Sequence, residues 1–372
     1  MTLYRVTRAE VDLDAIAHNA RTMAELADGA VLCAVVKANA YGHGAIAVSR
    51  ALEQAGVKWL AVATVEEAIS LRQAGVDAPR ILVLSEPPSG SEPTIAEERI
   101  TSTVYSVGCV DRLARAAADR KRVLALHLKV DTGMHRVGCA PAEAVAIADH
   151  IAATESVVLE GVWTHCARAD EEDPSFTNEQ LDRFDAVLAS LDAAGHRPPL
   201  VHAANSAGVI AHRRSHYGMV RTGIAIYGVA PSETLDGRAE LVPAMRLASE
   251  VSHVHDHGPG EGVSYGHFHR TTDDCTLATV PIGYADGVRR DLSAHGGEVL
   301  LRGTRYPIIG RVTMDQLIVD CGKDEVEAGD EVVLLGSQGD DAITADEIAR
   351  RLDTIGYEVL CAVSARVPRV YG

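Results

Sequence analysis

Apolar runs alternate with helical patterns over the first two thirds of the chain. Short runs, most of them rich in valine, leucine and alanine, recur at 31–36, 59–63, 81–84, 102–105, 124–130, 159–164, 200–203 and 219–227. Between them, apolar residues return at helical spacing, as at 65–74, 110–118, 142–153 and 178–194. Continuous apolar runs are typical of strands that are buried on both faces of a parallel sheet. Eight such strands with helical crossovers predict a (β/α)8 TIM barrel over residues 11–240.

The pattern changes after about Pro243. Shorter alternating runs follow at 247–257, 275–282, 299–301, 316–321 and 331–335, with glycine and aspartate turns between them. This pattern predicts a mainly antiparallel C-terminal β domain over residues 241–372. One helix, at 347–352, is expected to interrupt it, opened by a capping box from Thr344 to Glu347. Residues 1–10, and 3–6 in particular, are expected to join this domain.

Composition narrows the function classes. The chain has 372 residues, 47% of them hydrophobic, and a net charge of −17, which favours a large core and argues against nucleic acid as a partner. No segment is apolar enough for a membrane span or a signal peptide, so a cytoplasmic protein is expected. Seven cysteines without a Cys-x-x-Cys pair argue against disulfides or a zinc knuckle. His253, His255 and His257 alternate without an acidic partner motif, which favours a solvated strand face over a metal site.

Polar side chains stand just after several predicted strands. Lys37 ends the first apolar run, and the small residues after it lead to Tyr41 and a turn with two glycines. A lysine at a strand end is often a surface ion pair, but here the small neighbours leave room for a ligand. The C-terminal ends of barrel strands form the mouth where barrel active sites lie. The other polar residues in such positions are Arg136, His165, Ser206 and Arg221.

The segment Val31-Leu-Cys-Ala-Val-Val-Lys37-Ala-Asn-Ala-Tyr41-Gly-His-Gly44 resembles the cofactor-lysine motif of alanine racemases, which use pyridoxal 5'-phosphate (PLP). The resemblance runs from Val11 to Tyr371. It implies a barrel with a C-terminal β domain, and a homodimer whose active sites are shared between subunits. It also implies that L- and D-alanine are interconverted by two-base proton transfer on a PLP aldimine, supplying D-alanine for peptidoglycan. Lys37 would condense with the PLP aldehyde as a Schiff base.

The resemblance also assigns roles to individual residues. The two bases would be Lys37 and, from the partner subunit, the tyrosine of Gly262-Val-Ser-Tyr265-Gly. Lys129 would be carbamylated to N6-carboxylysine and hold Arg136. Besides Lys37, the cofactor would be bound by Tyr41, Arg136, His165, Asn205, Ser206, Arg221, Gly223, Ile224 and Tyr357. The substrate would be bound by Arg136, Met314, Tyr284 and Asp315.

Simple chemistry explains why two of the roles that the resemblance implies suit these residue types. In the family, the arginine at the position of Arg221 faces the pyridine nitrogen, where a guanidinium donates a hydrogen bond but hardly acts as an acid. The ring nitrogen therefore stays unprotonated. A tyrosine that acts as a base needs neighbours that lower its pKa, which is ordinarily about 10, and His165 is a suitable partner.

Structural explanations remain open for several of these residues. Arg221 could form a salt bridge, Ser206 could be a helix N-cap, and Lys129 could pair with Asp131 or a glutamate. Tyr265, Tyr284 and Asp315 could be ordinary turn residues.

Three other functions remain possible at this stage. One is a broader racemase that acts on serine or basic amino acids. Another is a PLP decarboxylase of similar architecture, although such enzymes place a carboxylate where Arg221 stands. The third is a non-catalytic PLP carrier, although such proteins resemble the barrel alone and here a complete β domain follows.

Overall fold

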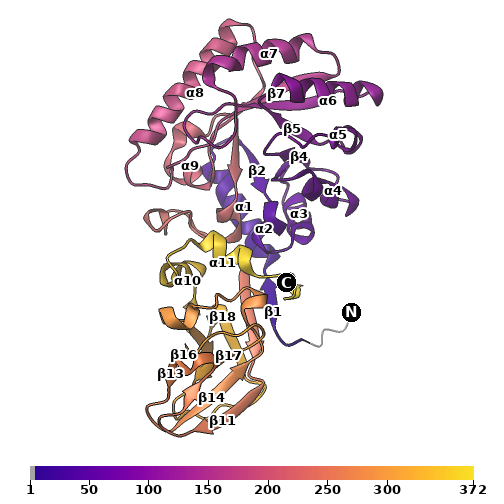
Figure 1. Cartoon of the computed structure of the whole chain (residues 1–372). Helices are drawn as coiled ribbons and strands as arrows, with labels where there is room; N and C mark the ends of the chain where they lie inside the picture. The colour runs from indigo at the N-terminus through magenta and orange to yellow at the C-terminus, as the bar shows by residue number, and fades with distance from the viewer. Residues whose placement is uncertain (1–4) are drawn as a thin grey trace. The chain divides into compact units, whose positions relative to one another are not determined.

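The computed structural model describes residues 5–372 and divides into two compact units. The barrel unit comprises Asp14–Ala40 and Ala45–Val242. The sheet unit comprises the segment that ends at Leu13, the short segment Tyr41–Gly44, and Pro243–Gly372. In the barrel unit, eight parallel strands, β2 to β9, close in chain order with helices outside them (Figure 1). The predicted TIM barrel is confirmed.

The barrel strands lie within one or two residues of their predicted ends, β9 excepted. They are β2 Val31–Val35, β3 Trp59–Val62, β4 Arg80–Val83, β5 Thr101–Val104, β6 Leu124–Lys129, β7 Val157–Trp163, β8 Leu200–His202 and β9 Met219–Thr222. The helices are α1 Leu13–Leu26, α2 Lys37–Tyr41, α3 Ala45–Gln54, α4 Val65–Gln73, α5 Glu92–Glu98, α6 Val107–Asp119, α7 Ala144–Ala153, α8 Ser175–Ala193 and α9 Ser206–Ala211. A capping box between Thr64 and Glu67 opens α4, and Ser106 caps α6, so local sequence sets where these helices begin.

The predicted strand at 219–227 is wrong in its second half. Strand β9 ends at Thr222, and the 3-10 turn η3 Ile224–Tyr227 follows. All four residues of η3 are buried, so their apolar character could not separate a strand from a turn. The Tyr227 hydroxyl donates to the Val35 carbonyl at 2.8 Å, which ties this turn to the end of β2.

Helix α2 has an unusual backbone. Four successive residues, Ala38 to Tyr41, have φ between 51° and 55°, the left-handed helical region. For residues with a Cβ this conformation costs roughly 1–2 kcal/mol each. Hydrogen bonds hold the turn: the Ala38 amide donates to Glu67 Oε1 at 2.6 Å, and the Ala45 amide donates to Asn39 Oδ1 at 2.9 Å. The turn fixes the direction in which the chain leaves Lys37.

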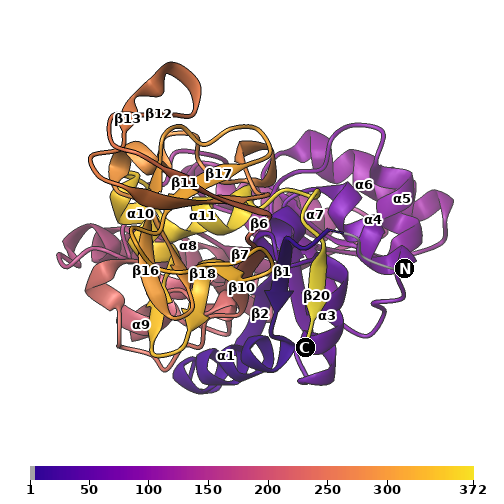
Figure 2. The same ribbon diagram turned by 90° about the horizontal axis from the view of Figure 1, so that it is seen from below.

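The sheet unit contains the expected antiparallel domain. Its main sheet has the order β11-β14-β17-β16-β15-β18-β10-β1-β20, with β19 paired to β18, and β12 and β13 form a separate pair. The strands are β1 Arg8–Val11, β10 Met245–Glu250, β11 His253–His257, β12 Gly262–Val263, β13 His269–Arg270, β14 Cys275–Val280, β15 Glu298–Leu301, β16 Thr304–Ile309, β17 Leu317–Asp320, β18 Glu331–Gln338, β19 Asp341–Ile343 and β20 Arg369–Tyr371. Figure 2 shows β1 beside β20, with which it pairs in parallel.

Several predictions for this unit need correction. The single run expected at 247–257 is split into β10 and β11, and strand β16 was not expected. The predicted helix is present as α10 Ala345–Arg351, and a second helix that was not expected, α11 Gly356–Ala362, follows it. Thr344 does cap α10, because its hydroxyl accepts from the Glu347 amide at 3.0 Å. Of the segment 3–6 that was expected to pair with this domain, residues 3 and 4 lie outside the described part of the chain, and the pairing strand begins at Arg8.

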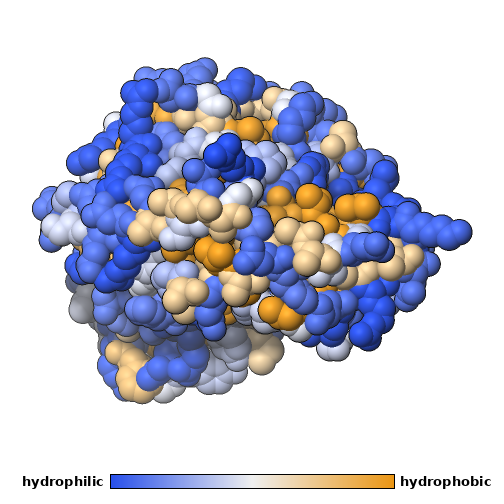
Figure 3. Space-filling model, turned by 90° about the horizontal axis from the view of Figure 1, so that it is seen from above, coloured by the Kyte–Doolittle hydropathy of each residue, from blue (hydrophilic) through white to orange (hydrophobic). Residues whose placement is uncertain are grey.

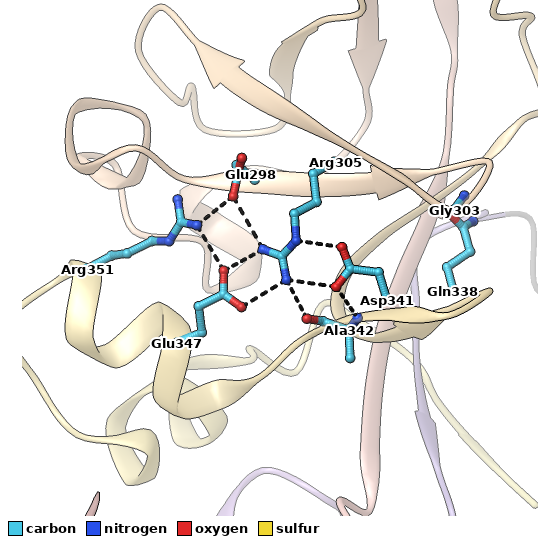
Figure 4. Close-up of polar contacts among 8 residues, drawn as sticks. All are labelled: Glu298, Gly303, Arg305, Gln338, Asp341, Ala342, Glu347 and Arg351. Carbon is cyan, nitrogen blue, oxygen red and sulfur yellow. Dashed lines mark hydrogen bonds and ion pairs between the residues drawn. The ribbon is translucent and has the colours of Figure 1, made fainter.

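An ionic network fastens α10 to the sheet (Figure 4). Arg305 of β16 donates from Nη1 to Glu347 Oε1 at 2.6 Å and from Nε to Asp341 Oδ2 at 2.7 Å. Arg351 of α10 donates to Glu298 Oε2 at 2.5 Å. Shared carboxylates between two guanidinium groups give geometric specificity as well as attraction. The network therefore fixes the base of the helix pair whose second member, α11, carries Tyr357.

The surface mixes polar and apolar residues. On the face shown in Figure 3, small hydrophobic patches are separated by hydrophilic side chains, as is usual for protein surfaces in water. Among the helices of residues 5–372, none has the length and apolar character needed to cross a membrane.

Candidate active site

The predicted site residues fall into two groups, one in each unit. In the barrel unit, each follows or ends a strand, so they gather at the C-terminal mouth of the barrel, where barrel active sites lie. This group comprises Lys37, Lys129, Arg136, His165, Asn205, Ser206, Arg221, Gly223 and Ile224. The second group comprises Tyr41, Tyr265, Tyr284, Met314, Asp315 and Tyr357.

Arg221 is a buried cation held by neutral acceptors. Its side chain is 3% exposed and donates to the carbonyl oxygens of Thr164 and Ala203, at 2.8 and 2.9 Å. It also donates to Nδ1 of His202 at 2.8 Å and to Nδ1 of His165 at 3.2 Å. Burial lowers the pKa of Arg221 to about 10, so the guanidinium still carries its charge at neutral pH. These partners are carbonyls and imidazoles and not carboxylates, so they do not form the salt bridge that was the structural alternative for Arg221.

His165 is neutral and has a defined tautomer. Burial lowers its pKa well below the usual value, and the nearby cations Arg221, Lys129, Arg136 and Lys37 lower it further. Because Arg221 donates to Nδ1, the proton of the neutral ring lies on Nε2. His165 therefore offers an N–H donor at the barrel mouth.

Trp163, which the sequence analysis did not single out, lies between the cations. Lys129 Nζ is 4.2 Å from the centre of its indole, and the Arg221 guanidinium carbon is 4.5 Å from it. These are cation–π distances. Burial lowers the pKa of Lys129 to about 7, and the cations Arg221, Arg136 and Lys37 contribute. This shift makes the neutral amine of Lys129 available near neutral pH.

The Asp131 carboxylate accepts hydrogen bonds from main-chain amides of its own loop. Its Oδ1 accepts from the amides of Gly133 and His135, at 2.9 and 3.1 Å. A Cβ at Gly138 would lie 2.8 Å from the Asp131 amide, so the chain folds back tightly here. This closed loop carries Arg136, whose side chain is exposed. A close Lys129–Asp131 pair, the simple alternative for Lys129, is not among these contacts.

Ser206 is not a helix N-cap. Asn205 caps α9 instead, since its Oδ1 accepts from the Gly208 amide at 2.9 Å. The Ser206 hydroxyl is buried and accepts from the Gly223 amide at 2.9 Å. The Ser206 hydroxyl therefore lies near the first residues of two helical segments, α9 after strand β8 and η3 after strand β9. Barrels commonly bind phosphate at this place, with main-chain N–H groups and a hydroxyl.

In the sheet unit, two turns are joined by their main chains. The Tyr284 amide donates to the Thr313 carbonyl at 2.9 Å, and the Ala285 amide to the Met314 carbonyl at 3.0 Å. A Cβ at Gly283 would lie 2.3 Å from the Thr313 carbonyl oxygen, so only glycine permits this approach. The contact sets Tyr284 and Met314 side by side.

Two arginines brace the same turns. Asp286, which is fully buried, pairs with Arg5 at 2.6 Å, and its Oδ2 accepts from the Gly283 amide at 3.0 Å. Arg366 pairs with Asp315 at 2.7 Å. Asp315 therefore takes part in an ion pair beside Met314. Nothing in the sequence separates Asp286 from other turn aspartates, so its role was not predicted.

Tyr265 is the most exposed aromatic residue of this group. Its side chain is 71% exposed and follows Ser264, whose hydroxyl donates to the Arg311 carbonyl at 2.8 Å. Tyr284 and Met314 are also exposed, at 40% and 52%. Exposed apolar residues in one region are typical of interaction surfaces.

Tyr41 and Tyr357 form a separate pair. Their ring centres are 6.1 Å apart, with the planes tilted by 51°. A Cβ at Gly42 would overlap the Leu360 carbonyl oxygen, at 2.4 Å, so the turn after Lys37 packs closely on α11. Burial raises the pKa of Tyr41, which keeps its phenol protonated at neutral pH.

A barrel with a cationic cluster at the C-terminal ends of its strands is typical of barrel enzymes, and the comparisons with known proteins identify its family. The alanine racemase N-terminal domain model matches residues 11–231, and the alanine racemase C-terminal domain model matches residues 244–371. The alanine racemase of Symbiobacterium thermophilum is 45% identical over 369 residues, covering 99% of this chain and 97% of that protein.

Solved structures agree. The alanine racemase of Clostridium difficile 630 superposes with a TM-score of 0.95 at 38% identity, covering 100% of this chain and 97% of that one. The Bacillus anthracis alanine racemase, solved with bound L-Ala-P, gives a TM-score of 0.92 at 39% identity, covering 100% of this chain and 96% of that one. The chain belongs to the alanine racemase family.

Proposed function

We propose that the protein racemises alanine, interconverting the L- and D-forms with PLP bound at the barrel mouth. The carrying observation is the buried Arg221, a donor-only cation whose partners are carbonyls and imidazoles. Full-length family membership supports the same activity. Formation of D-alanine in the cytoplasm for peptidoglycan precursors is part of this proposal.

The residues present fit PLP. Ser206 and the amides that follow it suit a phosphate, and Lys37 at the end of β2 supplies an amine for the aldehyde. Arg221 supplies a donor for the ring nitrogen without acting as an acid. When bound, PLP supplies an electron sink for the carbanion left by removal of the α-proton.

Two bases are needed because racemisation removes a proton from one face and returns one to the other. We assign Lys37 Nζ to one face and the Tyr265 hydroxyl to the other. The Nε2–H of the neutral His165 is a suitable donor to a tyrosinate, because a hydrogen bond to the charged form favours that form. Arg136 and the Met314 amide are assigned to the substrate carboxylate, and Tyr284 and Tyr357 to the entrance.

We also propose that two subunits share each site. Tyr265, Tyr284 and Met314 are exposed in the isolated chain. Exposed residues of this kind are expected where one subunit contributes side chains to the site of its partner. A two-fold dimer would then contain two equivalent composite sites.

Lys129 is proposed to be carbamylated. A neutral amine attacks carbon dioxide, its nitrogen bonds to the carbon, and a proton from the nitrogen is released to water. Burial beside Arg221 and Arg136 makes the neutral amine available at neutral pH. The product is an anion among cations, which would hold Arg136 in place. Asp131, which is engaged with its own loop, leaves the Lys129 amine available for this reaction.

The test is chiral chromatography of L-alanine, L-serine and L-lysine incubated with the protein and PLP. We expect D-alanine to form fastest and no amine product from lysine. Borohydride reduction should attach the cofactor to the peptide that contains Lys37, with a Lys37→Ala variant as control. Rapid racemisation of serine or lysine, or labelling of Lys58 instead, would contradict the proposal.

A further inference from the structure

A chain of hydrogen bonds leads away from Arg221 through the barrel interior. His202 and His127 are both fully buried, and His202 Nε2 lies 2.9 Å from His127 Nδ1. His127 Nε2 lies 3.3 Å from Glu160 Oε2, and the other oxygen of Glu160 is paired with Arg80. The proposed reaction makes no use of His127, Glu160 or Arg80.

The two ends of this chain impose one direction on every hydrogen bond. Arg221 has only donors, so His202 Nδ1 must accept and the His202 proton lies on Nε2. That proton is donated to His127 Nδ1, which places the His127 proton on Nε2, facing Glu160. An ionised carboxylate only accepts, so the arrangement is complete and unique.

Both imidazoles are neutral in this arrangement. Burial lowers the pKa of His127, although the hydrogen bond to Glu160 opposes the shift, and burial beside Arg221 lowers the pKa of His202 well below its usual value. Burial alone would raise the pKa of Glu160, but hydrogen bonds from His127 and Arg80 lower it. The single anion of the chain is therefore Glu160, and Arg221 is the buried cation at the opposite end.

The barrel core is shaped to hold these rings, although barrel interiors are usually filled by branched aliphatic residues. A Cβ at Gly161 would lie 2.6 Å from His127 Nδ1, so the glycine makes room for the imidazole. The His202 ring stacks on Trp163 with 5.5 Å between centres and 6° between planes. Trp59 lies 5.5 Å from the His127 ring.

We propose that His202, His127 and Glu160 form a positioning chain that holds Arg221 oriented as a donor toward the cofactor ring nitrogen. This inference rests on the proposed function, because it concerns the partner of Arg221. The Glu160 carboxylate requires the proton of each histidine to lie on Nε2. With that arrangement, His202 Nδ1 is an acceptor for the Arg221 guanidinium. If Glu160 could donate, His127 and His202 could both reverse, and His202 Nδ1–H would then oppose Arg221. Glu160 thus acts through two other side chains.

The test compares four variants. His127→Phe interrupts the chain, whereas His127→Gln keeps its direction, since the amide oxygen accepts from His202 and the amide nitrogen donates to Glu160. Glu160→Gln keeps the shape and removes the charge. Glu92→Gln is the matched control, because Glu92 is also buried, at 5% exposure, and pairs with Arg112 at 2.6 Å. Neither residue belongs to the series of hydrogen bonds that runs from Arg221 to Glu160.

Nitrogen NMR of protein labelled with ¹⁵N-histidine reads the tautomers directly, with or without cofactor. We expect wild-type His202 and His127 to be protonated on Nε2 only, with the signals assigned from the His127 variants. In the holoenzyme, His127→Phe should lower kcat about 10- to 100-fold, the loss seen when the partners that orient metal ligands are removed, and His127→Gln should restore most of it. Glu160→Gln should move the pH midpoint of the cofactor absorbance to lower pH, because removal of an anion disfavours protonation nearby.

The inference is overturned if wild-type His202 is protonated on Nδ1, or if Glu160→Gln titrates like Glu92→Gln. It is also overturned if His127→Phe folds and keeps the wild-type kcat. Should His127→Phe not fold, the NMR and Glu160→Gln results decide alone. A wild-type protein that binds no PLP or racemises no alanine would instead refute the proposed function, and the NMR result would still stand by itself.

Discussion

Lys129 should take up carbon dioxide at neutral pH far more readily than an ordinary lysine. Its pKa is lowered to about 7, so about half of the side chains are neutral at pH 7. A lysine with a pKa of about 10.4 is neutral in only about 0.04% of molecules at that pH. The reactive fraction is thus about 10³-fold larger. Half-saturation with carbon dioxide should need a correspondingly lower pressure, before any gain from the cations around the carbamate is counted.

Carbon NMR of the protein equilibrated with ¹³C-bicarbonate measures this uptake. A carbamate signal should appear at pH 7 and vanish in Lys129→Met, whereas Lys58→Met, which alters an exposed lysine, should leave it unchanged. Arg136→Met should weaken the signal, because Arg136 supplies one of the cations that attract the anion. If the signal survives in Lys129→Met, or appears only above about pH 9, the argument from burial is refuted.

Three further predictions test the site. A mixed dimer of Lys37→Ala and Tyr265→Phe chains should hold one wild-type site, so random reassortment of equal amounts should restore activity to about a quarter of all sites, while a dead mixed dimer would show that each site is built within one chain. Arg221→Glu should permit protonation of the ring nitrogen, which changes the cofactor spectrum with substrate and slows racemisation; an unchanged spectrum and rate would make Arg221 structural. Gly283→Ala should lower stability by about 1–3 kcal/mol and raise KM for alanine, because its Cβ meets main-chain atoms of the opposite turn. Gly108→Ala, in open space on a helix, is its control in thermal melts and kinetics.

The barrel could be predicted well from the sequence, because its buried strands are apolar runs and its helices show apolar residues at helical spacing. Strands such as β2, β3 and β4 are almost wholly apolar, and a polar residue such as Lys37 or His165 follows the end of a strand. The same signal failed at 224–227, where burial is complete but the backbone forms a 3-10 turn. Strand β16 was missed because Thr304, Arg305 and Pro307 stand among its first four residues, where they interrupt the apolar alternation, and Arg305 is held in ion pairs.

The interior of the site was less accessible to sequence reasoning. Alanine and asparagine at 38–40 would ordinarily predict a right-handed helix, and nothing local reveals the left-handed turn. His127 and His202 stand inside the segments that drew attention to Lys129 and Ser206. Their contact depends on which faces of β6 and β8 meet in the barrel, a three-dimensional fact that spacing along one chain does not contain.

Strand β1 has a consequence for how the protein is made. It pairs with β10 on one side and with β20, residues Arg369–Tyr371, on the other. During translation, residues 14–242 can close their barrel while later residues are still inside the ribosome, because domains generally fold as they emerge. The first strand has no pairing partner until Met245 and then Tyr371 are released. A ribosome that stalls before residues 369–371 have emerged would therefore leave β1 with an open edge, which is a template for aggregation.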